Sequence, residues 1–172
     1  MNSPKFSFVI FAAFFSLTAL ATLAQNNAFS DPNVDYSFAL PNAVWKITAK
    51  PSAINPNVEY VYGERDDGYL EVRKTTVAKG AMMPDIIRDE EQKRQFLPGF
   101  VAGKEENFLG KLRGAVFNFE YVHSGHPMSG RYYFLKANDT TVYMLRFSGE
   151  KDSLRTIQNQ TDAIARTFFS KQ

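Results

Sequence analysis

The sequence predicts an α+β domain built on an antiparallel β-sheet, and three observations support that prediction. Residues 114–147 contain three runs of alternating side chains separated by turn residues, which is typical of consecutive antiparallel strands. The 172 residues include 16 Phe and 8 Tyr, and such flat side chains favour strands over helical bundles. Two helical segments are separated by several extended runs instead of alternating with single strands. We therefore expect a sheet of about six to seven strands flanked by helices.

The N-terminal segment has the three parts of a secretory signal peptide. Lys5 is the only charged residue in residues 1–24, residues 6–17 are apolar, and residues 22–24 offer small side chains for cleavage. We expect residues 1–24 to be removed and the protein to be exported, to the periplasm or the extracellular space. The alternative is an uncleaved segment that tethers the protein to the membrane.

Composition excludes several classes of site. The formal net charge of +2 gives no electrostatic reason to expect a nucleic-acid partner, and any contact with a membrane surface is expected to be peripheral. The chain has no cysteine, which excludes disulfides, cysteine nucleophiles, thiolate metal sites and a lipid-modified N-terminal cysteine. A bacterial envelope compartment is compatible with a domain that relies on packing alone.

The first extended segments follow a polar stretch. Residues 25–34 predict a flexible leader, which leaves residues 35–172 as one domain. Within that domain, residues 36–40 and 44–48 predict two strands, and the second strand contains the single tryptophan.

A hairpin is the next predicted element. Residues 58–62 and 69–77 are alternating runs, and the dipeptide Asp67–Gly68 between them is a strong short-range signal for a tight turn.

Residues 84–97 predict the first helix. Pro84 suits a first helical turn, and Pro98–Gly99 ends the helix. Its few apolar residues form no clean stripe, so we expect the helix to be mostly solvated, including residues 89–91. Two favourable i,i+4 pairs are expected on its surface, Asp89 with Lys93 and Glu90 with Arg94. Residues 100–112 are interpreted as a connection with a short strand near Phe108.

The central strands begin at residue 115. Phe117, Phe119 and Tyr121 alternate with other residues, which places their rings on one face of a pleated strand. The remaining turns are expected at residues 124–128 and Asn138–Asp139, and the remaining strands at residues 131–135 and 142–147. The aromatic side chains of these strands are expected to be core residues; the alternative is an exposed platform for carbohydrate, peptide or protein, formed by Tyr132, Tyr133, Phe134, Tyr143 and Phe147.

Residues 153–169 predict the second helix. Its apolar stripe has spacings of three and four and consists of Leu154, Ile157, Thr161, Ile164 and Phe168. Asp152 is the expected N-cap. We expect the stripe to lie across the aromatic face of the sheet.

These segments together resemble the PsbP-like superfamily. The resemblance is carried by residues 36–41, Trp45, the hairpin and charged helix, and residues 109–115, 119–121, 131–133, 142–145 and 165–169. This superfamily includes the extrinsic PsbP subunit of photosystem II, a fungal Ran-binding nuclear import factor and bacterial envelope proteins of the DcrB type. The resemblance implies an antiparallel sheet sandwiched between helices, and it implies members that act by docking onto other macromolecules.

His123 and His126, the only histidines, are the candidate ligand-binding residues, together with Arg131. A turn could direct both imidazoles to one metal ion or anion, but a metal site needs a further ligand, for which Glu120 or Asp139 are candidates. The commoner explanation of this spacing is a hairpin loop whose histidines have no such role.

An enzyme is the least favoured class. Ser124 follows a histidine, but no Gly-x-Ser-x-Gly motif surrounds it, and adjacent strand residues point to opposite faces. No phosphate-binding glycine loop is present, and we expect no cofactor. The first hypothesis is therefore an exported, non-catalytic accessory protein that docks onto a protein partner or envelope complex. The second is a metal or small-ligand binder that uses His123 and His126.

Overall fold

The computed structural model describes residues 27–171. The predicted signal peptide lies outside the described residues, as do the first two residues of the predicted leader. Among the described residues, no helix is both long enough and apolar enough to cross a membrane.

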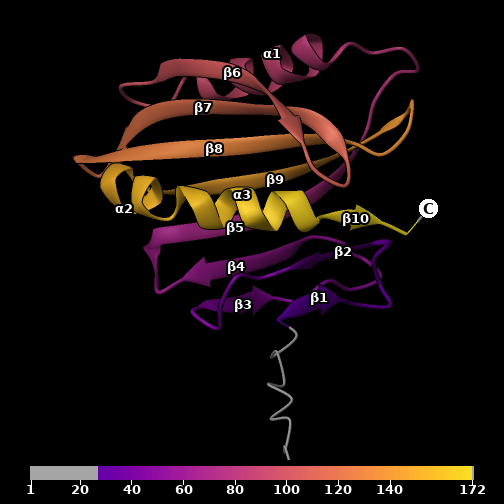
Figure 1. Ribbon diagram of the computed structural model, residues 1–172. Coiled ribbons are helices and arrows are strands. Elements are labelled where there is room, and N and C mark those ends of the chain that lie inside the picture. The colour runs from indigo at the N-terminus through magenta and orange to yellow at the C-terminus, as the bar shows by residue number, and fades with distance from the viewer. Residues whose placement is uncertain (1–26, 172) are drawn as a thin grey trace, which may run out of the picture.

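The described chain forms a large sheet, a small sheet and three helices (Figure 1). The large sheet has the order β3-β4-β5-β9-β8-β7-β6 and is antiparallel throughout, with strands β3 (Trp45–Ala49), β4 (Val58–Tyr62), β5 (Glu64–Thr76), β6 (Val101–Leu109), β7 (Arg113–His123), β8 (His126–Lys136) and β9 (Thr141–Glu150). The small sheet has the order β1-β2-β10, with strands β1 (Ala28–Ser30), β2 (Tyr36–Ala39) and β10 (Phe169–Ser170). The helices are α1 (Met83–Arg94), α2 (Lys151–Thr156) and α3 (Gln158–Thr167). The predicted α+β class and antiparallel sheet are confirmed.

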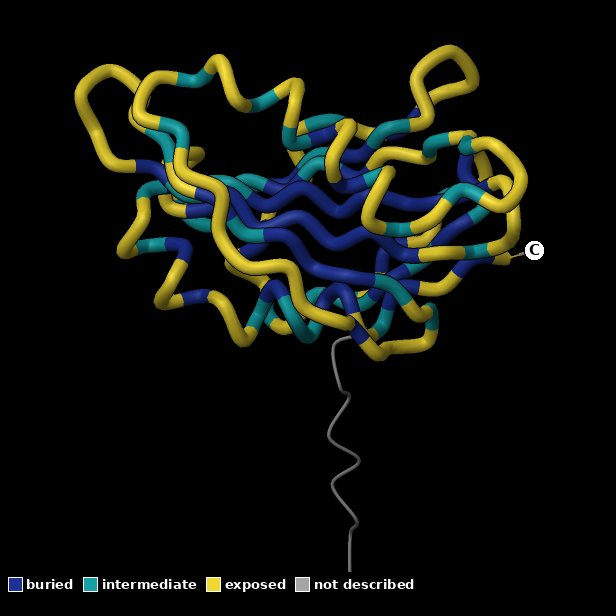
Figure 2. The backbone as a smooth tube through the Cα atoms, turned by 90° about the horizontal axis from the view of Figure 1, so that it is seen from above, coloured by how far each residue is buried: buried dark blue, intermediate teal, exposed yellow. Residues whose placement is uncertain are grey.

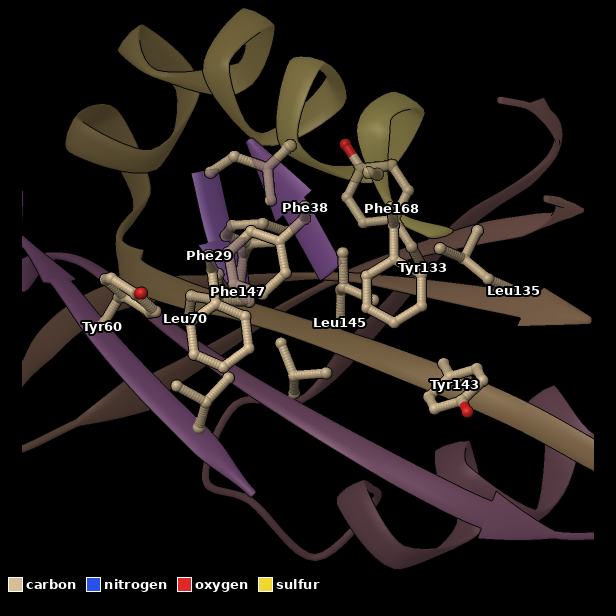
Figure 3. Close-up of a cluster of buried hydrophobic side chains, with 14 of the residues drawn as sticks. Phe29, Phe38, Tyr60, Leu70, Tyr133, Leu135, Tyr143, Leu145, Phe147 and Phe168 are labelled. Carbon is tan, nitrogen blue, oxygen red and sulfur yellow. The ribbon is translucent and has the colours of Figure 1, made fainter. Parts of the chain in front are cut away.

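The main core lies between the large sheet and the helices α2 and α3 (Figure 3). Every member of the predicted C-terminal stripe is at most 4% exposed, which confirms that it covers the sheet. The central strands are buried along most of their length (Figure 2). Core packing of the five platform aromatics is also confirmed, since none is more than 5% exposed. Burial of each large apolar side chain contributes about 1.5–3 kcal/mol, so this layer dominates the stability of the fold.

The C-terminal helix is divided, which corrects the prediction of one continuous helix. Ile157 separates α2 from α3 with φ −97° and ψ 11°, angles outside the usual helical region. Its side chain packs over Gly68, where a Cβ atom would lie 2.7 Å from Ile157 Cδ1. The Asp152 N-cap is also wrong: α2 begins two residues earlier than predicted, with Glu150 as N-cap and no side-chain capping bond.

Regular structure begins before Tyr36, within the part of the predicted leader that the structure describes. Residues Ala28–Ser30 form β1, which pairs antiparallel with β2. Phe29 is only 7% exposed, and its ring stacks on Phe38 with centroids 4.9 Å apart. A single buried phenylalanine within a polar stretch leaves little periodicity to detect.

Two further segments differ from expectation. The β4–β5 hairpin turns at Gly63, whose φ is +64°, and residues 65–68 form a bulge inside β5 instead of the predicted Asp67–Gly68 turn. Residues 100–112 contain the nine-residue strand β6. This edge strand is exposed on both faces except at Phe108, so it lacks the alternation that marks a half-buried strand.

The turn between β7 and β8 is shorter than predicted. It contains only Ser124 and Gly125, with φ of 50° and 83°, so β8 begins at His126. Two consecutive positive φ values are what a two-residue hairpin of this hand requires.

Helix α1 packs on the opposite face of the sheet from α2 and α3 (Figure 3). Its buried residues are Ile87 and Glu90, and the smaller core beneath it includes Phe117, Phe134 and Met144. The predicted helix at residues 84–97 is confirmed, but it ends earlier, at Arg94. The helix does not cover the sheet beyond this point.

Asp35 connects the segment before β2 to the large sheet. Its carboxylate accepts hydrogen bonds from Lys74 Nζ and from the Tyr143 hydroxyl, the latter at 2.7 Å. Burial by itself raises the pKa of Asp35, but these donors outweigh burial, and the pKa lies below its usual value of 3.8. The resulting stabilisation is present above pH 3.8 and is lost as the pH falls through the lower, folded-state pKa.

We therefore expect Asp35→Asn to lower the free energy of unfolding at neutral pH by about 1 kcal/mol. The difference from the unmodified protein should shrink as the pH falls below about 4. Urea unfolding of both proteins from pH 7 to pH 2.5 measures this, with the exposed Asp89→Asn as control. A pH-independent difference would show that the carboxylate charge at Asp35 makes no contribution.

Candidate functional site

A cleft of about 340 Å³ opens on the α1 face of the sheet, beyond the end of that helix. Arg94 and Leu97 border it on the helix side. The sheet contributes side chains from four strands, including Tyr69, Tyr121 and Arg146. The cleft exists because α1 stops at Arg94 while the strands beneath it continue.

Arg146 forms the floor of the cleft. The residue is 7% exposed, and its Nη2 donates to Glu90 Oε1 at 2.7 Å. Its Nη1 lies 3.5 Å from Glu71 Oε2. The buried Nε has no hydrogen-bond partner among the described residues. Buried guanidinium nitrogens nearly always have acceptors, so this group is short of them.

Glu90 joins α1 to this floor. It is 2% exposed, and the same Oε1 that binds Arg146 also accepts bonds from Arg94 Nε at 3.3 Å and Nη2 at 3.1 Å. Lys93 Nζ lies 3.4 Å from the other carboxylate oxygen. A single oxygen therefore serves two guanidinium groups.

Tyr132 lies close to both of these arginines. The Cζ atoms of Arg94 and Arg146 are 5.5 Å and 5.6 Å from its ring centroid, within the range of cation–π attraction. Burial raises the pKa of Tyr132 to about 12. The phenol is therefore protonated at neutral pH and can donate a hydrogen bond, but it does not act as a base.

The bulge in β5 supplies the wall facing α1. Residues 65–68 pack against Gly149 of β9, where a Cβ atom would lie 2.9 Å from Asp66 O. Within the bulge, Arg65 Cζ lies 4.0 Å from the Tyr69 ring centroid. Arg65 is exposed and has no ion-pair partner among residues 27–171.

The two predicted histidines are brought together. His123 and His126 are directly opposite each other at the end of the β7–β8 hairpin, and both are exposed. His123 lines the cleft, and His126 Nδ1 lies 3.6 Å from Glu150 Oε1. Within the described part of the chain, no group of three or more His, Asp or Glu residues is arranged to hold a metal ion.

Arg131, the third predicted ligand-binding residue, does not join the histidines. Its side chain is on the α3 side of the sheet, where Nη2 donates to Asp162 Oδ1 at 2.8 Å, Nε to the Tyr133 hydroxyl at 2.7 Å and Nη1 to Asn118 Oδ1 at 2.7 Å. Burial lowers the pKa of Arg131, but the interactions with Asp162 and Tyr133 together outweigh burial, and the net pKa is raised. These bonds connect strand β8 to helix α3.

The residues that build the cleft were not predicted as a site. Glu90 was expected to be solvated, and this is wrong, because it is buried against Arg146. The i,i+4 pair of Glu90 with Arg94 is confirmed, whereas Lys93 pairs with Glu90 instead of Asp89. A detectable signal was Arg146 itself, a charged residue inside the apolar run 142–147.

Comparison with known proteins identifies solved structures with a similar fold. No protein family and no curated protein matches the sequence. The structure is similar to LpqN, involved in cell envelope biogenesis of Mycobacterium tuberculosis, at 15% identity and a TM-score of 0.57, covering 81% of this chain and 85% of LpqN. It is also similar to the cyanobacterial PsbP of Synechocystis sp. PCC 6803, at 16% identity and a TM-score of 0.60, covering 90% of this chain and 98% of that PsbP.

A third similar structure is the Ran-binding protein Mog1p of Saccharomyces cerevisiae, at 9% identity and a TM-score of 0.61, covering 86% of this chain and 96% of Mog1p. At these identities the likeness establishes the fold and not the function. The expected PsbP-like fold is confirmed.

Proposed function

We propose that this protein is a non-catalytic accessory protein that binds a protein partner, with the cleft beside α1 as the docking surface. The observation that carries the proposal is the incomplete cover of this sheet face. Helix α1 ends at Arg94, and aromatic and arginine side chains line the cleft that remains. The opposite face is covered by α2 and α3 and has an apolar core.

The composition of the cleft is that of a protein-binding surface. Tyrosine and arginine are enriched at interface positions that contribute most to affinity, and Tyr69, Tyr121 and Arg94 are all partly accessible. Phe96, which precedes the cleft residue Leu97 in sequence, is 83% exposed. An exposed aromatic ring in this segment favours contact with a partner.

The similar structures support this class of function. Mog1p is a Ran-binding protein, and LpqN is involved in cell envelope biogenesis. A role in the cell envelope would also agree with the sequence of residues 1–24. Because one fold hosts many functions, the proposal depends on the cleft and not on these similarities alone.

A blocked cleft tests the docking proposal. Ser148 lines the cleft and is half-buried, so Ser148→Trp should fill it without removing any arginine. We expect this variant to lose at least about tenfold in the recovery of the partner from the envelope fraction of the native organism, a loss of about 1.4 kcal/mol in binding. Thr156→Trp, at an exposed position of α2, is the matched control. Equal recovery by the two folded variants would contradict the proposal.

Export is the second part of the proposal. Strand β1 begins at Ala28, so removal of residues 1–24 would leave every described element intact. We expect mass spectrometry of the protein from its native host to show a mature chain that starts at Gln25. An intact N-terminus on protein from the cytoplasmic fraction would contradict export.

A metal or small-ligand binder is the second candidate function. It is favoured by the direct pairing of His123 with His126, which places two imidazoles side by side at the end of the β7–β8 hairpin. Metal analysis of the purified protein tests it. Stoichiometric metal that is lost in both His123→Ala and His126→Ala would favour this candidate over docking.

A further inference from the structure

We infer that the cleft binds an acidic segment of the partner, with an Asp or Glu carboxylate received between Arg94, Arg146 and Arg65. This inference rests on the docking function proposed above and specifies its chemistry. Arg94 and Arg146 approach from the helix end and the floor, and Arg65 comes from the facing wall. All three line the same cleft.

The first reason is the balance of hydrogen-bond donors and acceptors. Each guanidinium group has five N–H donors and no acceptor. Arg94 and Arg146 both bond to Glu90 Oε1, and the other carboxylate near Arg146 is Glu71 at 3.5 Å. Glu71 Oε1 already accepts from Arg73 Nε at 2.7 Å. The cleft therefore has more donors than protein acceptors, and an incoming carboxylate would supply two oxygens that can accept in parallel.

The second reason concerns charge. The cleft is lined by three arginines but only two acids, Asp66 and Glu71, with His123 at its edge. Glu90, which bonds Arg94 and Arg146 from below, is also paired with Lys93, so about one positive charge is left over. A single negative charge is consistent with that balance, whereas a phosphate dianion would be repelled by the nearby acids. The geometry thus favours a carboxylate over a phosphate.

The third reason concerns what surrounds the carboxylate. The rings of Tyr69 and Tyr121 and the side chains of Leu97 and Met128 line the same cleft. A free carboxylic acid would leave these surfaces uncovered, whereas a peptide that carries apolar residues beside its acid would cover them. The ligand class is therefore an acidic side chain flanked by apolar or aromatic residues.

Binding of defined peptides tests the inference. The probe is acetyl-Phe-Asp-Phe-amide, and the comparison peptide is acetyl-Phe-Asn-Phe-amide, which has the same shape without the charge. Titration of the purified protein is followed through the arginine Nε–H signals in ¹⁵N NMR spectra. We expect saturable shifts of the Arg94 and Arg146 signals with the Asp peptide, and at least tenfold weaker binding of the Asn peptide.

Charge-removing variants identify the groups responsible. Arg65→Gln and Arg94→Gln should each lower the affinity for the Asp peptide at least tenfold. Arg88→Gln, on the exposed side of α1, should leave that affinity unchanged. Arg65 is exposed and outside the core, so its variant gives a clear result even if Arg94→Gln is destabilised. If neither variant weakens binding of the Asp peptide, the inference is overturned.

Three further outcomes overturn it: equal affinity for the Asp and Asn peptides, inorganic phosphate binding as tightly as the Asp peptide, or acetate alone binding as tightly. Failure here is distinguishable from failure of docking. If Ser148→Trp abolishes recovery of the partner while Arg65→Gln and Arg94→Gln do not weaken it, docking stands and the acidic segment is excluded. If none of the three affects recovery, both proposals fall.

Discussion

Replacement of Ile157 by aspartate is expected to unfold the protein. Ile157 is 3% exposed and packs between the helical layer and the sheet, over Gly68. The substitution removes about 1.5–3 kcal/mol of apolar burial and places a carboxylate where it has no partner, which costs several kcal/mol more. Domains of this size have a total stability of about 5–15 kcal/mol, so little or none would remain.

Circular dichroism and thermal unfolding measure this effect. The matched control is Asn159→Asp, which adds the same charge at an exposed position two residues further along. We expect the control to unfold within a few degrees of the unmodified protein. A melting curve of Ile157→Asp that overlays the control would mean that this face of α2 and α3 points to solvent.

Replacement of Glu90 by alanine is expected to detach α1 from the sheet. Glu90 is the acceptor for both Arg94 and Arg146, and Arg146 is itself 7% exposed. Removal of one member of a buried ion pair leaves the other charge without compensation and typically costs about 3–5 kcal/mol. Ile87 is the only apolar residue of α1 that is fully buried in the described structure, with Met83 and Ile86 partly buried beside it, so the ion pairs of Glu90 carry much of the attachment.

Urea unfolding and amide hydrogen exchange test this prediction together. We expect Glu90→Ala to lose about 3–5 kcal/mol in stability or, where α1 detaches locally, to lose protection from exchange in residues 83–94. Asp89→Ala, at the neighbouring exposed position, should change stability by about 0.5 kcal/mol or less. Similar values for the two variants would show that the pair with Arg146 does not hold the helix.

The two faces of the sheet differ in how well the sequence predicted them. The α2 and α3 side was predicted because Leu154, Ile157 and Ile164 recur at helical spacing and face alternating strands. The interruption at Ile157 was not predicted. Its side chain packs over Gly68, and such a tertiary contact leaves no mark in the spacing of apolar residues. Periodicity reports which face of an element is buried but not where a packing contact breaks the helix.

The α1 side shows the opposite case. Only a short strand near Phe108 was predicted where β6 has nine residues, because an exposed edge strand has no alternation. Glu90 was misassigned because its neighbours on α1 are solvated. The cleft depends on the position at which α1 ends relative to β9, which local sequence does not encode. Arg146 was the available signal, since a charged residue within a buried strand needs a partner or a function.

The histidines illustrate a third case. Their pairing across the hairpin follows from the short turn at Ser124 and Gly125, and His123 does reach the cleft. Arg131, selected with them from sequence, is on the other face in bonds to Asp162 and Tyr133. Alternation along β8 separates the two locations, because residues an odd number of positions apart point to opposite faces.

Photo-cross-linking from two sites tests the docking surface most directly. A benzoylphenylalanine is placed at Phe96, which is exposed and next in sequence to Leu97 of the cleft, and in a second protein at Arg155, on the opposite face. In the native envelope fraction, we expect one discrete protein adduct from position 96, its loss when Ser148→Trp is added, and no matching adduct from position 155. Adducts from position 155 alone, or equal adducts from both positions, would contradict a partner at the cleft.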